Sequence, residues 1–242
     1  MAIAFNAATN VGPAFGLTQT VSHTASGADR FAVVTIGMFE DRVTGVTYGG
    51  VAMTRVGARV VNGTVGHTVY MLVGPATGAQ NVVVTFAADT PSWMTARIVV
   101  ASYTGVHQAT APVTAVPLEG YGTAPAVTLT TPAADSLLIH TVSFAANTAM
   151  TTADTARFEG ESGNQRRLGV ADRLVPAAGS ATGTWSAGAT ANNWTAIGIA
   201  LAPAAGTTPP AETADCTVRV GGALVPAVTR HRVGGVLVPA PA

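Results

Sequence analysis

Residues able to act as a nucleophile, an acid or a base are few in this chain, and they do not form a catalytic pattern. The five histidines are His23, His67, His107, His140 and His231. A hydrolase of the serine type needs a serine, a histidine and an acid together. No Gly-x-Ser-x-Gly string is present, and the nearest one, Gly160-Glu161-Ser162-Gly163, has the wrong spacing. We therefore expect no catalytic residues and no enzymatic activity.

Metal and nucleotide chemistry are not expected either. The sequence has no His-x-x-x-His or Cys-x-x-Cys spacing for zinc, and Cys216 is its single cysteine. All 12 basic residues are arginine. A phosphate-binding loop that ends in Gly-Lys-Ser or Gly-Lys-Thr is therefore impossible. We expect neither a cofactor nor a metal ion.

Two groups of residues could instead bind a ligand. Glu159 and Glu161 stand in the most polar segment, which predicts a solvated loop with local ion pairs. A recognition loop or a Ca²⁺ site is the functional alternative for this segment. A tryptophan ring can stack on a sugar, and Trp185 and Trp194 flank one loop. In strands, however, tryptophan is more often part of the core. Trp185, Trp194, Glu159 and Glu161 together are called the predicted ligand loop.

The elements that must carry these residues are β-strands. Apolar and polar residues alternate at period two in short segments separated by Gly, Asn, Asp or Pro. That pattern is the signature of a sandwich or barrel. The clearest predicted strands are 31–39, 51–61, 67–73, 81–87, 93–103, 126–130, 137–144, 167–175, 183–186 and 194–202. We predict an all-β chain whose residues 1–203 form a two-sheet β-sandwich of jelly-roll type.

Turn residues and an internal similarity support this fold. Tyr48-Gly49-Gly50 and Asn62-Gly63 predict tight hairpin turns. Residues 28–39 are similar to residues 134–144, and each segment opens with Ala-Asp after a Thr-rich strand. The similarity indicates either two related halves, each adding strands to both sheets, or merely two strands that obey the same pattern.

The composition limits the classes of partner that this chain is expected to bind. Only 10% of the residues are charged, the formal net charge is zero and no basic stripe is present, so we expect no nucleic-acid binding. No stretch reaches the roughly 20 apolar residues that span a bilayer, so we expect no membrane insertion. The low charge indicates that part of the surface is covered in an assembly. The first residues lack the pattern of a signal peptide, so we expect synthesis and assembly in a cytoplasm.

The C-terminal part contains a repeat. Arg219-Val220-Gly221-Gly222-Ala223-Leu224-Val225-Pro226 returns as Arg232-Val233-Gly234-Gly235-Val236-Leu237-Val238-Pro239. A Pro-, Thr- and Ala-rich segment, 204–215, precedes the repeats and predicts an extended linker. The repeat segment, 216–242, predicts a short β-rich tail.

This tail is predicted to attach the protein to something else. An isolated hairpin is marginal in water, so the repeats must lie on the main domain, on another copy or on a partner. The residues expected to dock are Arg219, Val220, Gly221, Gly222, Arg232, Val233, Gly234 and Gly235.

Several strings resemble those of known proteins. Residues 46–56, Val-Thr-Tyr-Gly-Gly-Val-Ala-Met-Thr-Arg-Val, are similar to a string of bacteriophage and bacterial sandwich proteins. The runs 70–78 (Tyr-Met-Leu-Val-Gly-Pro-Ala-Thr-Gly) and 102–106 (Ser-Tyr-Thr-Gly-Val) follow in the same order. The Val-Arg-Val-Gly-Gly repeats resemble the tails of minor tail proteins from phages of GC-rich actinobacteria. The resemblance covers residues 28–203 loosely and 216–239 more specifically.

The resemblance implies a structural virion protein of a tailed phage, assembled in the host cytoplasm. It implies a homo-oligomer, such as a trimer, that contacts other virion proteins and carries no enzymatic residues. Three functions stay open at this point. The first is a minor tail or tail-fibre component that acts in assembly and in adhesion to the host surface, with a cell-wall glycan as a partner. The second is a capsid decoration protein, and the third is a carbohydrate-binding module.

Overall fold

The computed structural model describes residues 2–57, 60–109, 112–114 and 118–204, together with four short strands between residues 217 and 239. The chain divides into two compact units, Met1–Ala204 and Ala205–Ala242. Every regular element among the described residues is a β-strand. The prediction of an all-β protein is therefore confirmed.

The first half of unit one forms two antiparallel sheets. The larger sheet has the strand order β1 (Ala4–Ala14), β10 (Ala96–Thr104), β3 (Phe31–Met38) and β8 (Val65–Val73), with β6 (Thr54–Arg55) and β7 (Val60–Asn62) along β8. The smaller sheet has the order β2 (Thr18–Ala25), β9 (Gly78–Phe86), β4 (Val43–Tyr48) and β5 (Val51–Ala52). Buried Val34, Ile36, Val84 and Ile98 belong to the core between the two sheets.

The second half repeats this arrangement. Its larger sheet has the order β18 (Asn192–Leu201), β14 (Ser136–Phe144), β16 (Arg166–Val175) and β15 (Thr155–Gly163), with β11 (Val113–Thr114) and β12 (Leu118–Gly122) along β18. Its smaller sheet pairs β13 (Ala126–Thr131) with β17 (Gly179–Thr184). Leu129, Leu138 and Ala181 are buried between them.

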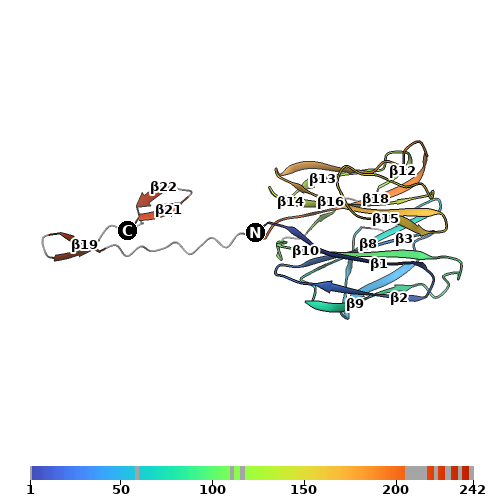
Figure 1. The fold of residues 1–242 in the computed structure, drawn as a ribbon, viewed down its shortest axis with the longest axis horizontal. Helices are drawn as coiled ribbons and strands as arrows, with labels where there is room; N and C mark the ends of the chain where they lie inside the picture. Colours follow the sequence, from blue (N-terminus) through green and yellow to red (C-terminus); the bar gives the residue numbers. More distant parts are fainter. Residues whose placement is uncertain are drawn as a thin grey trace. The chain divides into compact units, whose positions relative to one another are not determined.

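The two large sheets face each other, which confirms the predicted two-sheet sandwich. Phe31 and Tyr103 from the first half pack with Leu137 and Ile197 from the second. The two smaller sheets cover the outer faces, and Figure 1 shows the layers from β13 at the top to β2 and β9 at the bottom. Each half thus forms its own large sheet rather than adding strands to both. Because β3 and β14 lie inside large sheets covered on both faces, every residue of these strands is buried.

Strand register is equivalent in the two halves. Phe31 pairs with Val73 and with Tyr103. At the equivalent place in the second half, Leu137 pairs with Leu174 and with Leu201. Asp29 and Asp135 precede these positions by two residues, and both adopt left-handed backbone, with φ of 51° and 55°. Asp tolerates this conformation better than most residues. The same turn therefore opens β3 and β14, and this supports the predicted relation between the halves.

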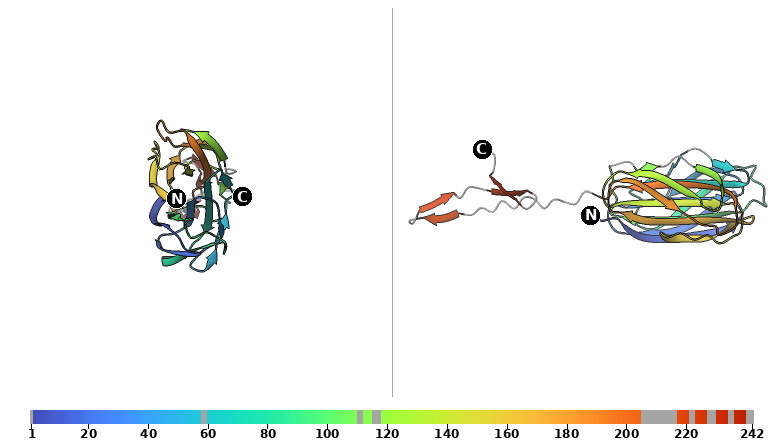
Figure 2. Two further views of the ribbon diagram at one scale, coloured as in Figure 1. Left: turned by 90° about the vertical axis from the view of Figure 1, so that its right-hand side faces the viewer. Right: turned by 90° about the horizontal axis from the view of Figure 1, so that it is seen from above.

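Unit one has two distinct ends. Ala2 and Ala204 lie at one end, where the Ala204 amide donates to the Gly105 carbonyl at 2.7 Å and Gly105 lies against Ala2. Strand β10 starts at Ala96 and finishes at Thr104, beside the end that holds Ala2 and Ala204. The loops 39–42 and 87–95 therefore lie at the opposite end. We call this opposite end the distal end. The strands of the sheets run along the length of the unit (Figure 2).

The second unit contains two hairpins that match each other. Strand β19 (Thr217–Val220) pairs with β20 (Ala223–Pro226), and β21 (Arg230–Val233) pairs with β22 (Val236–Pro239). Val220 is opposite Ala223 in the first hairpin, just as Val233 is opposite Val236 in the second. The prediction of a β-rich tail is confirmed for these strands. Residues 205–215 of the predicted linker and the docking candidates Gly221, Gly222, Gly234 and Gly235 lie outside the described residues.

Candidate ligand-binding surface

The predicted ligand loop does not form an open site, because Trp185 is buried. Its side chain is 3% exposed and packs in a core with Val142, Phe144 and Met150. A Cβ added at Gly169 would lie 2.8 Å from the Trp185 ring, so β16 approaches the ring closely. The expectation that Trp185 offers its face to a ligand is therefore wrong. Its ring fills the space beside the outer face of the large sheet.

Trp194 is only partly exposed and has a similar role. It packs against the same core as Trp185. Gly120 of β12 lies directly against its ring, where a Cβ would overlap the ring atoms. The structure thus brings Trp185 and Trp194 together as predicted, but it places them around a filled core rather than a cavity.

The two glutamates of the predicted ligand loop are in a strand, which corrects the prediction of a solvated loop. Glu159 and Glu161 belong to β15, which pairs with β16 through a turn at Asn164 and Gln165. Both Glu159 oxygens accept from Arg167, at 2.8 and 2.6 Å, and Glu159 Oε1 also accepts from the Met150 amide at 3.1 Å. This cross-strand ion pair offsets the charge of Glu159. We therefore interpret Glu159 as a residue that stabilises the hairpin.

Trp93 is the tryptophan that is open to solvent. It was predicted to lie in a strand with residues 93–103, but β10 begins at Ala96 and Trp93 stands in the preceding loop at the distal end. Its side chain is 53% exposed, whereas its neighbour Met94 is buried in the core. The Met94 amide donates to the Pro91 carbonyl at 3.0 Å, which closes a turn. This turn directs Met94 inwards and leaves Trp93 outside.

Phe39 holds the Trp93 ring in place. The two rings meet edge to face, with centroids 5.2 Å apart and planes at 86°. The Arg166 guanidinium lies over the Phe39 ring at 4.1 Å. Asn164 of the second half forms a hydrogen bond with the backbone of this loop, because its Nδ2 donates to the Trp93 carbonyl at 3.2 Å. The exposed ring is thus supported from both halves of the unit.

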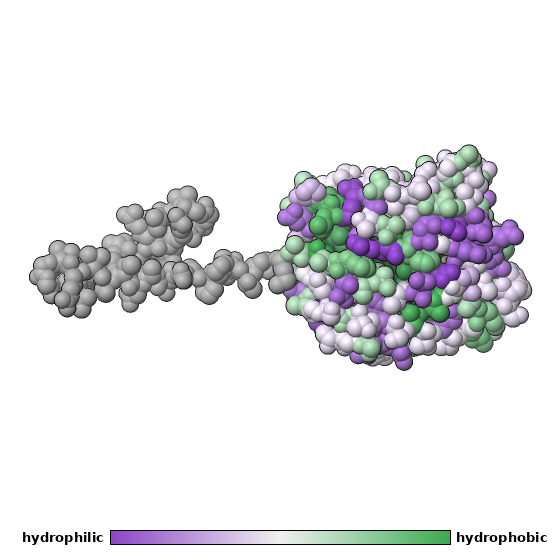
Figure 3. Space-filling model, viewed as in Figure 1, coloured by the Kyte–Doolittle hydropathy of each residue, from purple (hydrophilic) through white to green (hydrophobic). Residues whose placement is uncertain are grey.

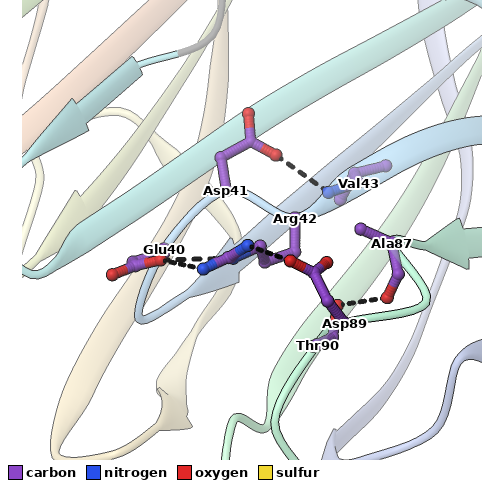
Figure 4. Close-up of polar contacts among 7 residues, drawn as sticks. All are labelled: Glu40, Asp41, Arg42, Val43, Ala87, Asp89 and Thr90. Carbon is purple, nitrogen blue, oxygen red and sulfur yellow. Dashed lines mark hydrogen bonds and ion pairs between the residues drawn. The ribbon is translucent and has the colours of Figure 1, made fainter.

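A polar network joins the loop that carries Phe39 to the loop that carries Trp93 (Figure 4). The Arg42 guanidinium donates to Glu40 Oε2 at 2.9 Å and to Asp89 Oδ2 at 3.2 Å. The Ala87 amide donates to the Arg42 carbonyl at 2.8 Å. We call Phe39, Glu40, Arg42, Asp89 and Trp93 the Trp93 surface.

A buried carboxylate fixes the loop beneath the Trp93 surface. Asp41 is 1% exposed, and its Oδ1 accepts from the Val43 amide at 3.1 Å (Figure 4). Its Oδ2 forms an ion pair with Arg55. A buried charge needs such partners to offset its lost hydration. Asp41 therefore anchors the loop, while Glu40 and Arg42 on either side of it reach the surface.

Replacing Gly66 with alanine is expected to disturb this loop. A Cβ at Gly66 would overlap the backbone of Glu40 and Asp41, and backbone atoms cannot move aside cheaply. We expect the free energy of unfolding to fall by about 1–3 kcal/mol, measured by urea denaturation. The matched control is Gly45→Ala, because nothing lies within 4 Å of a Cβ at Gly45. Equal stability of the two variants would contradict the proposed close packing.

The buried histidines have structural partners. His23 Nε2 and Ser102 Oγ form a hydrogen bond of 2.9 Å that links β2 to β10. Both residues are about 1% exposed, so this contact lies in the interior. His67 Nε2 contacts Thr141 Oγ1 at 3.1 Å across the two large sheets, and burial lowers the pKa of His67 to about 3. Burial also lowers the pKa of His140, although Asp154 Oδ2 at 2.8 Å opposes this. Among the described residues, no group of three or more His, Cys, Asp or Glu could hold a metal ion.

Comparisons with known proteins leave the family open. No protein-family model matches this chain, and no curated protein matches it. In the part of the chain that the structure describes, no helix is long and apolar enough to cross a membrane. Hydrophobic residues on the face drawn in Figure 3 form several separate patches divided by hydrophilic residues. Functional conclusions therefore rest on the Trp93 surface and on the two tail hairpins.

Proposed function

We propose that this chain is a structural virion protein of a tailed phage, acting as a minor tail or tail-fibre component that attaches through its C-terminal unit. The observation that carries this proposal is the pair of matching hairpins. Both 13-residue repeats fold into the same two-stranded unit with the same register. Two equal units in one tail suit attachment to partners that present equivalent surfaces.

The physical argument concerns the size of each hairpin. A two-stranded hairpin is marginally stable at best in water and needs a further strand or surface. Each strand pairs on one side only among the described residues, so its other edge offers backbone donors and acceptors. Strand addition by a neighbouring chain would satisfy those groups. Other virion proteins, or further copies of this chain in a homo-oligomer such as a trimer, are the partners that we propose.

The strings that carry the resemblance to phage sandwich proteins lie at turns of this sandwich. Gly49 and Gly50 adopt φ of 55° and 83° in the turn between β4 and β5. Gly74 and Gly78, with φ of 64° and 81°, bound the connection from β8 to β9. A residue with positive φ is best supplied by glycine. The strings that carry the resemblance therefore contain the glycines that this sandwich requires at its turns.

Deleting residues 205–242 is expected to abolish incorporation into virions while leaving unit one folded. Unit one contains its own cores and sheets, so its thermal unfolding and circular dichroism should stay close to those of the full chain. Incorporation is measured by immunoblotting purified particles after complementation with the truncated or the full chain. Deleting only residues 229–242 removes one hairpin and serves as the graded control. Normal incorporation of the 1–204 chain would overturn the proposal.

The position of the protein in the particle separates the two virion functions. Immunogold labelling on the tail supports a minor tail or tail-fibre component. Labelling over the capsid surface would instead support the decoration protein that the sequence left as an alternative.

A further inference from the structure

We propose that the Trp93 surface is a saccharide-binding site with a preference for neutral sugars. This inference concerns unit one alone and goes beyond attachment through the tail. The two proposals rest on different parts of the chain and can fail separately.

The exposure of Trp93 is the first observation. Large aromatic side chains gain the most from burial, and the other two tryptophans of this chain pack against a core. Trp93 is 53% exposed although its neighbour Met94 is 3% exposed. An exposed tryptophan at the end of a β-sandwich, where loops commonly carry binding residues, is available to stack on the apolar face of a sugar ring.

Fixed placement of the ring is the second observation. The edge-to-face contact with Phe39 at 5.2 Å and the Asn164 bond to the Trp93 carbonyl at 3.2 Å hold the loop from two sides. The Thr95 amide also donates to Asn164 Oδ1 at 3.3 Å. A ligand that stacks on a ring held in this way loses little of its binding free energy to ordering the protein.

The polar residues on the two loops that carry Phe39 and Trp93 indicate the class of ligand. Arg42 and the carboxylates of Glu40 and Asp89 have side chains 28%, 38% and 75% exposed. Arg42 engages Oε2 of Glu40 and Oδ2 of Asp89, and the second oxygen of each carboxylate accepts no hydrogen bond from any described residue. These oxygens can accept from sugar hydroxyls, and Arg42 can donate to a sugar oxygen. With two carboxylates against one guanidinium, the exposed part of the surface should reject anionic saccharides.

A protein partner fits these residues less well. The cores of protein interfaces are depleted of charged side chains, and a stable interface buries about 800 Å² on each partner. Here the exposed ring stands in loops that also present an arginine and two carboxylates. An exposed ring in loops that also carry groups able to bind hydroxyls suits a saccharide, which needs one stacking face and a few directed hydrogen bonds.

The test is titration of the full chain with defined oligosaccharides. The neutral probes are maltoheptaose, a β-1,4-galactan oligomer and chitotetraose, and polygalacturonate is the anionic probe. Isothermal calorimetry and tryptophan fluorescence are expected to show binding of at least one neutral probe, in the millimolar range or tighter, and none of polygalacturonate. Trp93→Ala should weaken the binding by at least about tenfold. Trp93→Phe should weaken it less.

The controls separate this site from other causes. Tyr121→Ala removes an aromatic side chain that is 72% exposed on β12, outside the Trp93 surface, and should leave the binding unchanged. The 1–204 chain should bind as the full chain does, so a failure of the tail proposal leaves this result intact. The inference is overturned if no neutral probe binds at about 10 mM, a concentration well above the dissociation constant expected here. Binding that survives in Trp93→Ala, or an effect of that substitution on protein association only, would overturn it too.

Discussion

Replacing Asp172 with alanine is expected to lower the free energy of unfolding by about 3–5 kcal/mol. Asp172 is a buried carboxylate on β16 of the second half. The Tyr103 hydroxyl, from β10 of the first half, donates to its Oδ2 at 2.7 Å. Arg157 donates to both oxygens, at 2.6 and 2.9 Å. One side chain therefore links the two halves across the interior of the sandwich.

The size of the effect follows from what the substitution leaves behind. Without Asp172, the fully buried Tyr103 hydroxyl loses its acceptor. Burial and the Asp172 charge raise the pKa of Tyr103 well above its usual 10, so this hydroxyl stays a donor. Arg157, which lies over the Phe5 ring at 3.8 Å, loses its counter-charge. Removing one partner of a buried pair is costly because the other keeps its desolvation penalty.

Tyr103→Phe is the matched control, because it removes a single hydrogen bond and leaves the Asp172–Arg157 pair intact. Its expected effect is about 1–2 kcal/mol. Both variants are measured by guanidinium denaturation followed by circular dichroism. If Asp172→Ala is no less stable than Tyr103→Phe, the network does not hold the halves together.

The second large effect is a loss of stability in acid that originates at His67. The pKa of this histidine is about 3 in the folded protein, against 6.5 when it is free, because burial disfavours the charged ring. Below pH 6.5 the unfolded chain binds a proton that the folded chain does not bind. The contribution of His67 to the free energy of unfolding is therefore complete above pH 6.5 and is lost as the pH falls towards 3. The loss is about 1.4 kcal/mol per pH unit, or about 2 kcal/mol at pH 5.

The pH profile is measured by urea denaturation between pH 7.5 and 5, before most carboxylates titrate. His67→Gln removes the ionisable ring while keeping a polar side chain opposite Thr141. Its stability at pH 7.5 should be lower than that of the unmodified chain, but below about pH 6 its profile should be flatter by about 1.4 kcal/mol per pH unit. His23 and His140, whose pKa values burial also lowers, give the remaining slope. A profile of unchanged slope would show that His67 is not buried in its neutral form.

Several parts of the fold could be read from local sequence. Strand β2, Thr-Gln-Thr-Val-Ser-His-Thr-Ala, alternates exposed and buried residues along its whole length, although two of its buried positions hold the polar residues Gln19 and His23. The turn at Gly49 and Gly50 is confirmed as a two-residue connection between Tyr48 and Val51. The segment 51–61, predicted as one strand, is divided into β5, β6 and the start of β7. The segment does not run as one strand because it pairs first with β4 and then with β8, in different sheets.

The candidate site was the least predictable part. The polar run from Glu159 to Arg167 is a hairpin in the structure, because Glu159 and Arg167 neutralise each other across the two strands. The sequence indicated local ion pairs in this run, but it did not show that they would form across two paired strands. Trp93 and Trp185 both lie in segments predicted as strands, yet one is open and the other is buried. The break at Pro91-Ser92 was the one local signal that β10 starts after Trp93.

The sequence alone determined the all-β class, the turn at Gly49 and Gly50 and the doubled tail, because each depends on contacts between residues close in the chain or on a repeated pattern. Only the tertiary structure decided which apolar faces meet and which tryptophan remains outside. Those outcomes depend on packing between segments far apart in the chain, such as Phe31 against Leu137 and Phe39 against Trp93. Period-two alternation marks a face as apolar, but the partner that covers that face is chosen by the whole fold.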